Sequence, residues 1–96
     1  MTQSQTIIAT LKAHLPELRE MGVKDLYVFG SVARGEANPH DVDILVDFEI
    51  TPSLFGLVGI QQRIEEWVGF HVDLVTRRAC SPRLFKNISQ DLQHVA

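Results

Sequence analysis

Three aspartates in this sequence stand where strands would bring them together. Asp41 and Asp43 alternate with apolar residues at the start of segment 41–48, and Asp73 lies inside a second apolar run, 71–76. Side chains two residues apart on a strand project on the same side, about 6.6 Å apart along it. A carboxylate inside an apolar run is costly unless it is paired, hydrogen-bonded or bound to metal. The spacing therefore predicts a carboxylate cluster able to hold a divalent cation such as Mg²⁺, which prefers hard oxygen ligands.

A glycine and a serine end the apolar run that precedes the aspartates. Residues 26–29 are aromatic and β-branched in character and lead into Gly30 and Ser31, which predicts a buried strand followed by a tight turn. Glycine lets the backbone approach a phosphate, and free N–H groups at such a turn suit an anion. A structural turn that binds nothing also explains these two residues. The spacing to Gly35 is not a P-loop, because Glu36 stands where lysine is required.

Hydrophobic periodicity predicts the elements that position these residues. Apolar residues at helical spacing indicate a helix over 6–15, which Pro16 interrupts before a second helical turn over 17–21. Alternation predicts a strand over 41–48, in which Asp47 is explained as the solvated side of a sheet. The other predicted elements are one helical turn over 31–35, a helix over 54–68, a strand over 71–76, and a final helix that starts at Ser81 and Pro82 and extends to Leu92. Together they indicate an α/β (α+β) fold, a small mixed β-sheet with helices packed on it, in a single domain over residues 1–96.

Composition restricts the classes of protein to consider. The 96 residues suit one small folded domain, and the net charge of −3 gives no basic field for direct nucleic-acid binding. The single cysteine, Cys80, has no internal disulfide partner. No apolar run reaches the length of about 18 to 20 residues that a membrane span needs, and the N-terminus lacks the pattern of a secretion signal. A cytoplasmic location is therefore expected.

Several other residues with chemical potential have simpler explanations. His14 has no second ligand type near it in the sequence, so a solvated or half-buried histidine is favoured over a metal ligand. Trp67 falls in the helical pattern of 54–68 and is interpreted as core or as a partner surface. A solvated surface is also the better interpretation of three basic residues, Arg77, Arg78 and Lys86.

The combination of motifs resembles a known superfamily. Gly30 and Ser31, nine intervening residues, the triplet Asp41-Val42-Asp43 and a later Asp73 are similar to the signature of polymerase-β-like nucleotidyltransferases. The stretches FGSVARGEA and VDLVT are similar to the minimal nucleotidyltransferases, whose characterised members act as antitoxins beside a HEPN-domain toxin. The resemblance covers nearly the whole chain and implies a polymerase-β-like palm. One departure is His40, where such proteins often have serine before the first aspartate.

The resemblance implies roles for the motif residues. Nucleotidyl transfer needs an oxygen nucleophile at the α-phosphorus of a nucleoside triphosphate, and two Mg²⁺ ions about 3.5 to 4 Å apart can stabilise the attacking and leaving oxygens. Asp73 is also suited to receive the nucleophile's proton. Arg34 is the best-placed cation for a triphosphate, although an exposed arginine on a helix face explains it equally well. The implied catalytic residues and ligands of two Mg²⁺ ions are Asp41, Asp43 and Asp73, and the implied ATP-binding residues are Gly30, Ser31 and Arg34.

A single short chain restricts the acceptor. No helical domain remains to bind one, so we expect another protein to present a hydroxyl that receives AMP from ATP. By resemblance, the acceptor is a tyrosine of a cognate HEPN ribonuclease toxin, which the chain would bind in a hetero-oligomer and neutralise. Two other interpretations stay open, a binding-only antitoxin with a vestigial nucleotide site and a transferase for a small molecule such as an aminoglycoside. The intact motif set favours catalysis over the first, and the missing acceptor domain disfavours the second.

Overall fold

Four strands form one mixed sheet in the order β3-β2-β1-β4 in the computed structural model, which describes residues 2–37, 39 and 41–95. The strands are β1 (Val23–Phe29), β2 (Asp41–Phe48), β3 (His71–Thr76) and β4 (Gln93–His94). β2 runs antiparallel to β1 and parallel to β3, and β4 pairs antiparallel with β1. The predicted mixed sheet is therefore confirmed, as are the predicted bounds of β2 and β3.

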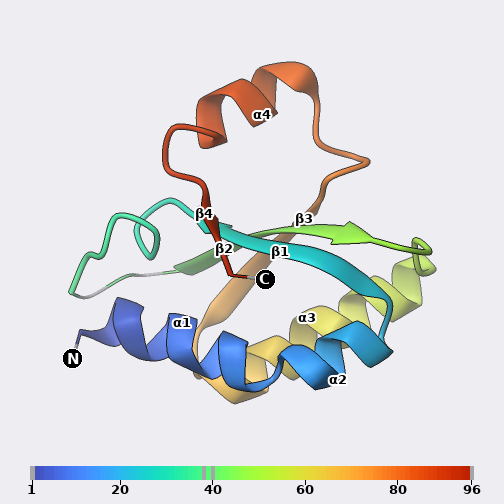
Figure 1. Cartoon of the computed structure of the whole chain (residues 1–96), viewed down its shortest axis with the longest axis horizontal. Coiled ribbons are helices and arrows are strands. Elements are labelled where there is room, and N and C mark those ends of the chain that lie inside the picture. The colour runs from blue at the N-terminus through green and yellow to red at the C-terminus, as the bar shows by residue number, and fades with distance from the viewer. Residues whose placement is uncertain (1, 38, 40, 96) are drawn as a thin grey trace.

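Helices lie on both faces of the sheet, in unequal numbers. Figure 1 shows α1 and α2 beside α3 on one face, while α4 stands alone over the other. The helices are α1 (Gln3–Ala13), α2 (Leu15–Glu20), α3 (Leu54–Val68) and α4 (Pro82–Ile88). α3 connects the parallel strands β2 and β3, as such a crossover requires. We call the face under α1, α2 and α3 the covered face and the opposite one the open face.

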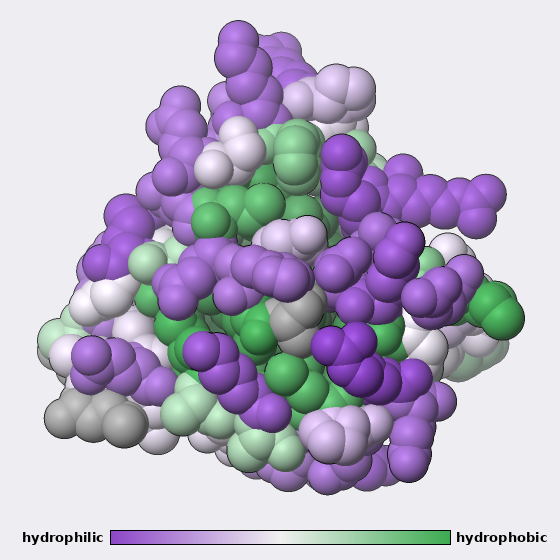
Figure 2. Space-filling view, viewed as in Figure 1, coloured by the Kyte–Doolittle hydropathy of each residue, from purple (hydrophilic) through white to green (hydrophobic). Residues whose placement is uncertain are grey.

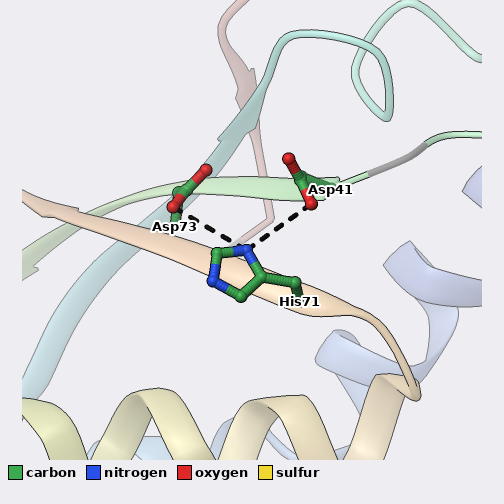
Figure 3. Close-up of side chains that lie close together, drawn as sticks. All are labelled: Asp41, His71 and Asp73. Carbon is green, nitrogen blue, oxygen red and sulfur yellow. Dashed lines mark ion pairs between the residues drawn. The ribbon is translucent and has the colours of Figure 1, made fainter.

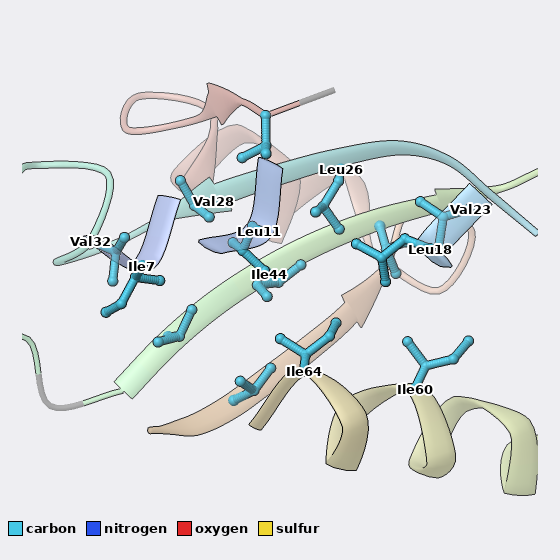
Figure 4. Close-up of a cluster of buried hydrophobic side chains, with 14 residues drawn as sticks. Ile7, Leu11, Leu18, Val23, Leu26, Val28, Val32, Ile44, Ile60 and Ile64 are labelled. Atoms are coloured by element: carbon cyan, nitrogen blue, oxygen red, sulfur yellow. The ribbon is translucent and has the colours of Figure 1, made fainter. Parts of the chain in front are cut away.

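The main hydrophobic core lies on the covered face. Alternate residues of β2, Val42, Ile44 and Val46, are at most 1% exposed there. They pack with Leu11 of α1 and Ile64 of α3, which are completely buried (Figure 4). Burying one such side chain contributes about 1.5 to 3 kcal/mol. The period-2 pattern of β2 therefore directs its apolar residues into the core and its aspartates to the open face.

A second, smaller cluster lies under α4 on the open face. Its buried members are Leu45, Cys80 and Ile88, and Leu92 packs against them. The prediction of a helix to Leu92 was wrong, because α4 ends at Ile88 and Leu92 reaches the cluster from the segment that follows. Figure 2 shows hydrophobic side chains gathered in the middle of this view, with hydrophilic ones around and across them.

The helix and strand ends differ from the predictions for local reasons. α1 begins at Gln3, earlier than predicted, because Thr2 caps it and the Gln5 side chain accepts a hydrogen bond from the Thr2 N–H in return. α2 begins at Leu15 because proline is tolerated in a first helical turn, where no N–H is needed. β1 starts at Val23, ahead of the predicted residues 26–29. β4 was not predicted.

His14 and Trp67 join the helices of the covered face. The two rings are stacked, with centroids 3.9 Å apart and planes 4° from parallel. The Nδ1 atom of His14 also lies 2.9 Å from Oε1 of Glu17. These contacts agree with structural roles for both rings. Among the described helices, none combines the length and apolar character that crossing a bilayer demands.

Candidate active site

The register of β2 and β3 brings the predicted aspartates together. In this parallel pair Asp43 stands opposite Asp73, and Asp41 stands opposite His71. All four residues lie on the open face, because they alternate with the buried residues of their strands. Asp41 and Asp43 lie at the beginning of β2, next to the end of β1, where Phe29 pairs with Asp43. The predicted cluster therefore forms at one end of the sheet.

His71 is a member of the cluster that the sequence interpretation missed. Its Nδ1 lies 3.5 Å from Asp41 Oδ1 and 3.9 Å from Asp73 Oδ1, and Figure 3 shows the imidazole between the two carboxylates. One ligand atom from each of these residues falls within 4.8 Å of the others. The available signal was its place two residues before Asp73, which puts both side chains on one strand face.

Asp43 packs against the turn at Gly30. Gly30 has φ 70°, and a Cβ atom on it would lie 2.5 Å from Oδ2 of Asp43. Real Cβ atoms do not approach an oxygen so closely, and a side chain at this φ is strained. The backbone conformation therefore favours glycine here, and a side chain at this position would also displace the Asp43 carboxylate.

Like charges surround Asp43. Partial burial, followed by the carboxylates of Asp73 and Asp41, raises the pKa of the Asp43 carboxyl above its usual range, and Arg34 acts weakly in the opposite direction. Two carboxylates that share a site repel, so at least one of them holds its proton more tightly. A divalent cation placed among the three would remove this repulsion, and oxygen ligands of this kind suit Mg²⁺. The donor set of the cluster therefore fits the metal that the sequence predicts.

The segment after Gly30 is a hydrogen-bonded turn. The Arg34 N–H donates to the Gly30 carbonyl at 3.0 Å, and the Glu36 N–H donates to the Ser31 carbonyl at 3.1 Å. The predicted helical turn over 31–35 does not continue as a helix, since Gly35 adopts φ 75°. Among the described residues, the N–H group of Ser31 has no hydrogen-bond acceptor. It is thus available for an anion beside the carboxylates.

The first helix fixes the position of this turn. Ser4 of α1 is 1% exposed, and its hydroxyl donates to the Glu36 carbonyl at 2.5 Å. Val32 is also 1% exposed and belongs to the main core. The turn is therefore anchored at both its start and its end, although its polar groups face solvent.

Arg34 stands at the outer side of the turn, held by two carboxylates. Its Nη2 lies 2.9 Å from Glu36 Oε2, and its Nη1 lies 2.9 Å from Asp91 Oδ2. Hydrogen bonds to these two acids raise the pKa of the guanidinium. The pair with Asp91 links the turn to the segment after α4. Its predicted contact with a triphosphate stays a prediction.

The remaining basic residues lie away from the cluster. The Arg77 guanidinium carbon lies 3.9 Å from the centre of the Phe85 ring, on the inner side of α4. Arg78 and Lys86 are exposed. These placements agree with surface roles. The departure at His40 lies outside the described residues.

Comparisons with known proteins identify the family to which this chain belongs. A family model described as a nucleotidyltransferase domain matches residues 11–94. The chain is 40% identical over 97 residues to protein adenylyltransferase MntA of Thermococcus cleftensis, covering 99% of this chain and 98% of the relative. This chain belongs to the nucleotidyltransferase domain family.

Solved structures confirm the predicted fold. One described as a minimal nucleotidyltransferase superposes with a TM-score of 0.80 at 34% identity, covering 97% of this chain and 95% of the other. An MNT antitoxin in complex with a tri-AMPylated HEPN toxin of Shewanella oneidensis matches with a TM-score of 0.65 at 22% identity, covering 98% of this chain and 69% of the other. The second match concerns the fold alone.

Proposed function

We propose that this chain transfers AMP from ATP to a tyrosine hydroxyl of a HEPN ribonuclease toxin and thereby neutralises it in the cytoplasm. The observation that carries the proposal is the placement of three carboxylates, Asp41, Asp43 and Asp73, beside a turn in which Gly30 leaves room for the Asp43 carboxylate. The 40% identity to a protein named protein adenylyltransferase supports AMP as the transferred group.

The turn after β1 receives the phosphates. Gly30 lets the backbone come close to the β- and γ-phosphates, and the Ser31 N–H and hydroxyl donate to their oxygens. Arg34, which pairs with Glu36 and Asp91 at the outer side of the turn, would bind the terminal phosphate after leaving one of these acids. This placement extends the triphosphate from the carboxylates toward the turn.

The carboxylates organise the reacting atoms. Asp41 and Asp43 would hold two Mg²⁺ ions, with Asp73 completing the site of one of them. When bound, these ions supply charge stabilisation to the attacking and departing oxygens. The acceptor hydroxyl oxygen forms a bond to the α-phosphorus, the bond from the α-phosphorus to the bridging oxygen breaks, and pyrophosphate leaves. The Asp73 carboxylate, 54% exposed on the open face, takes the hydroxyl proton.

The acceptor comes from another molecule. The cluster lies at the end of the open face, and the side chains of Asp41 and Asp73 are 51% and 54% exposed. α4 covers the middle of that face, over Leu45, rather than the carboxylates. A partner protein can therefore bring a tyrosine to the cluster without displacing any described element. We accordingly expect a hetero-oligomer of this chain with its toxin.

Label transfer tests the proposal. The purified chain is incubated with ATP labelled at the α-phosphate, Mg²⁺ and the protein encoded by the adjacent reading frame. We expect label on a tyrosine of that protein, and we expect Asp41→Asn to abolish it. The matched control is Asp47→Asn, which removes a carboxylate from the same face of β2 outside the cluster.

The outcomes separate the competing functions. Stable binding of the partner without label, in the presence of Mg²⁺, would contradict transfer and favour a binding-only antitoxin. Equal loss of label in both variants would show that the carboxylates act through general charge and not through the cluster. Label on an aminoglycoside but not on the partner would indicate a small-molecule transferase.

A further inference from the structure

His71 is the residue of the cluster for which the proposed reaction has no role. It opposes Asp41 across the parallel strands and precedes Asp73 on the same face of β3. We propose that His71 is a metal-ligating residue and that its imidazole makes this site prefer Mn²⁺ and similar divalent transition-metal ions to Mg²⁺. The inference rests on the proposed assignment of Asp41 and Asp73 as metal ligands.

The separations between the His71 nitrogen and the two aspartate oxygens suit a shared ion, and the three ligand atoms lie within 4.8 Å of one another. The Nδ1 of His71 lies 3.5 Å from Asp41 Oδ1 and 3.9 Å from Asp73 Oδ1. An ion about 2.1 Å from each of two ligands holds them about 3.0 Å apart at a right angle, about 3.4 Å at a tetrahedral angle and about 4.2 Å when opposite. Both measured distances fall within this range, and both exceed the usual length of a direct hydrogen bond.

Another histidine of the chain shows what a direct contact looks like. The Nδ1 of His14 approaches Oε1 of Glu17 to 2.9 Å, a hydrogen-bond distance. His71 approaches neither aspartate so closely and faces both. This arrangement leaves room for an ion at the point on which the imidazole and the two carboxylates converge (Figure 3).

Glu65 provides an independent observation, on the other side of the imidazole. Its Oε2 lies 4.0 Å from Nε2 of His71 and accepts a hydrogen bond from the Val72 N–H at 2.9 Å. A metal-binding histidine characteristically directs its second nitrogen toward a carboxylate, which fixes the tautomer and the ring orientation. Glu65, anchored by the backbone of β3, faces Nε2 at 4.0 Å, beyond the length of a direct hydrogen bond, and offers this nitrogen a carboxylate once an ion occupies Nδ1.

The chemistry of the donor set determines the preference. Mg²⁺ takes oxygen ligands almost alone and keeps much of its water. Imidazole nitrogen suits divalent transition metals, of which Mn²⁺ is the weakest binder in the series, whereas Mg²⁺ scarcely uses nitrogen ligands. Two aspartates alone would serve either ion. The added imidazole raises the affinity for Mn²⁺ without a corresponding gain for Mg²⁺.

Direct metal binding tests the proposal on the intact chain. Free Mn²⁺ is measured by electron paramagnetic resonance during titration, and Mg²⁺ is then added as a competitor. We expect His71→Ala to weaken Mn²⁺ binding by at least about tenfold. The affinity for Mg²⁺, obtained from the competition, should change by less than about twofold. The matched control is His94→Ala, because His94 lies on the same sheet, 3.5 Å from Asp25, and is similarly exposed. That variant should bind both ions as the unaltered chain does.

A spectroscopic measurement supports the result without any substitution. Electron spin echo modulation of bound Mn²⁺ should reveal coupling to one directly ligating ¹⁴N nucleus, and His71→Ala should remove that coupling. Unchanged Mn²⁺ affinity in His71→Ala, equal loss of both ions, or bound Mn²⁺ without nitrogen coupling would each overturn the proposal. Because none of these measurements uses ATP or a partner protein, failure of AMP transfer would leave the result standing, and the reverse also holds.

Discussion

The two faces of β2 differ in their effect on stability. On the covered face Val42, Ile44 and Val46 are almost completely buried and belong to the main core. On the open face Asp41 and Asp43 lie near Asp73, and the pKa of Asp43 is raised by partial burial and by repulsion from the other two carboxylates. One strand thus supplies stability through one set of alternate residues and opposes it through the other. A bound cation would relieve this repulsion, as the proposed metal site requires.

The largest effect is expected from the covered face. Ile44→Ala should lower the free energy of unfolding by about 2 to 5 kcal/mol, because the removed atoms leave a cavity in a closed core. Ile44 is completely buried, whereas the adjacent Asp43 lies on the other face of the strand. Urea denaturation measures the change, with Ile44→Val as the milder variant at about 0.5 to 1.5 kcal/mol. A loss below about 1 kcal/mol for Ile44→Ala would contradict the division between the faces.

An intermediate effect on stability is expected at Gly30. Comparison with Gly35 separates the effect of the backbone conformation from the effect of contact with Asp43. Gly30→Ala and Gly35→Ala each place a side chain at positive φ, 70° and 75°, which should cost about 1 to 2 kcal/mol in unfolding experiments. Only the Cβ at Gly30 would meet Asp43, while the one at Gly35 would meet no atom of the described chain within 4 Å. Label transfer and Mn²⁺ binding should therefore fall in Gly30→Ala alone. Equal losses in both variants would assign the effect to the turn and not to the carboxylate.

Elements defined by local sequence patterns could be predicted, whereas elements defined by pairing with distant parts of the chain could not. The two faces of β2 were predictable because alternation is a local property of the strand. β4 was not, because a strand of two residues, Gln93–His94, is defined only by its pairing with β1. Leu92 was predicted as helical from its apolar spacing, yet a partly buried residue can also reach a cluster from an irregular segment.

The candidate site shows the same division. Asp41, Asp43 and Asp73 were identified from spacing and from neighbouring apolar residues. His71 joins them through the register between β2 and β3, which no local pattern specifies. The link between Arg34 and Asp91 likewise spans 57 positions along the chain. His71 and Asp91 therefore escaped prediction, because only long-range contacts place them beside the other residues of the site.

A smaller effect on stability is expected when the pH changes. Its direction follows from the raised pKa of Asp43 on the open face. The pKa of Asp43 is raised above 3.8 in the folded chain, so the folded state binds this proton more tightly than the unfolded state does. The stability associated with it is fully present below about pH 3.8 and is lost as the pH rises through the folded pKa. Asp43→Asn should remove this part of the decline, which urea denaturation at several pH values would measure. Ile44→Val should instead shift the whole curve downward, and a steeper decline in Asp43→Asn would contradict the assignment.

The smallest effect on stability is expected for Arg34→Gln, which tests whether this cation serves the fold or the site. Half of its side chain is exposed, and exposed ion pairs such as those with Glu36 and Asp91 contribute little to unfolding free energy. Melting temperature should therefore match that of Arg63→Gln, an exposed control on α3. If Arg34 binds the triphosphate, the ATP concentration for half-maximal label transfer should rise in Arg34→Gln and not in the control. An unchanged ATP requirement would restrict Arg34 to joining the turn to the segment after α4, and the open face would then bind nucleotide through its backbone and carboxylates alone.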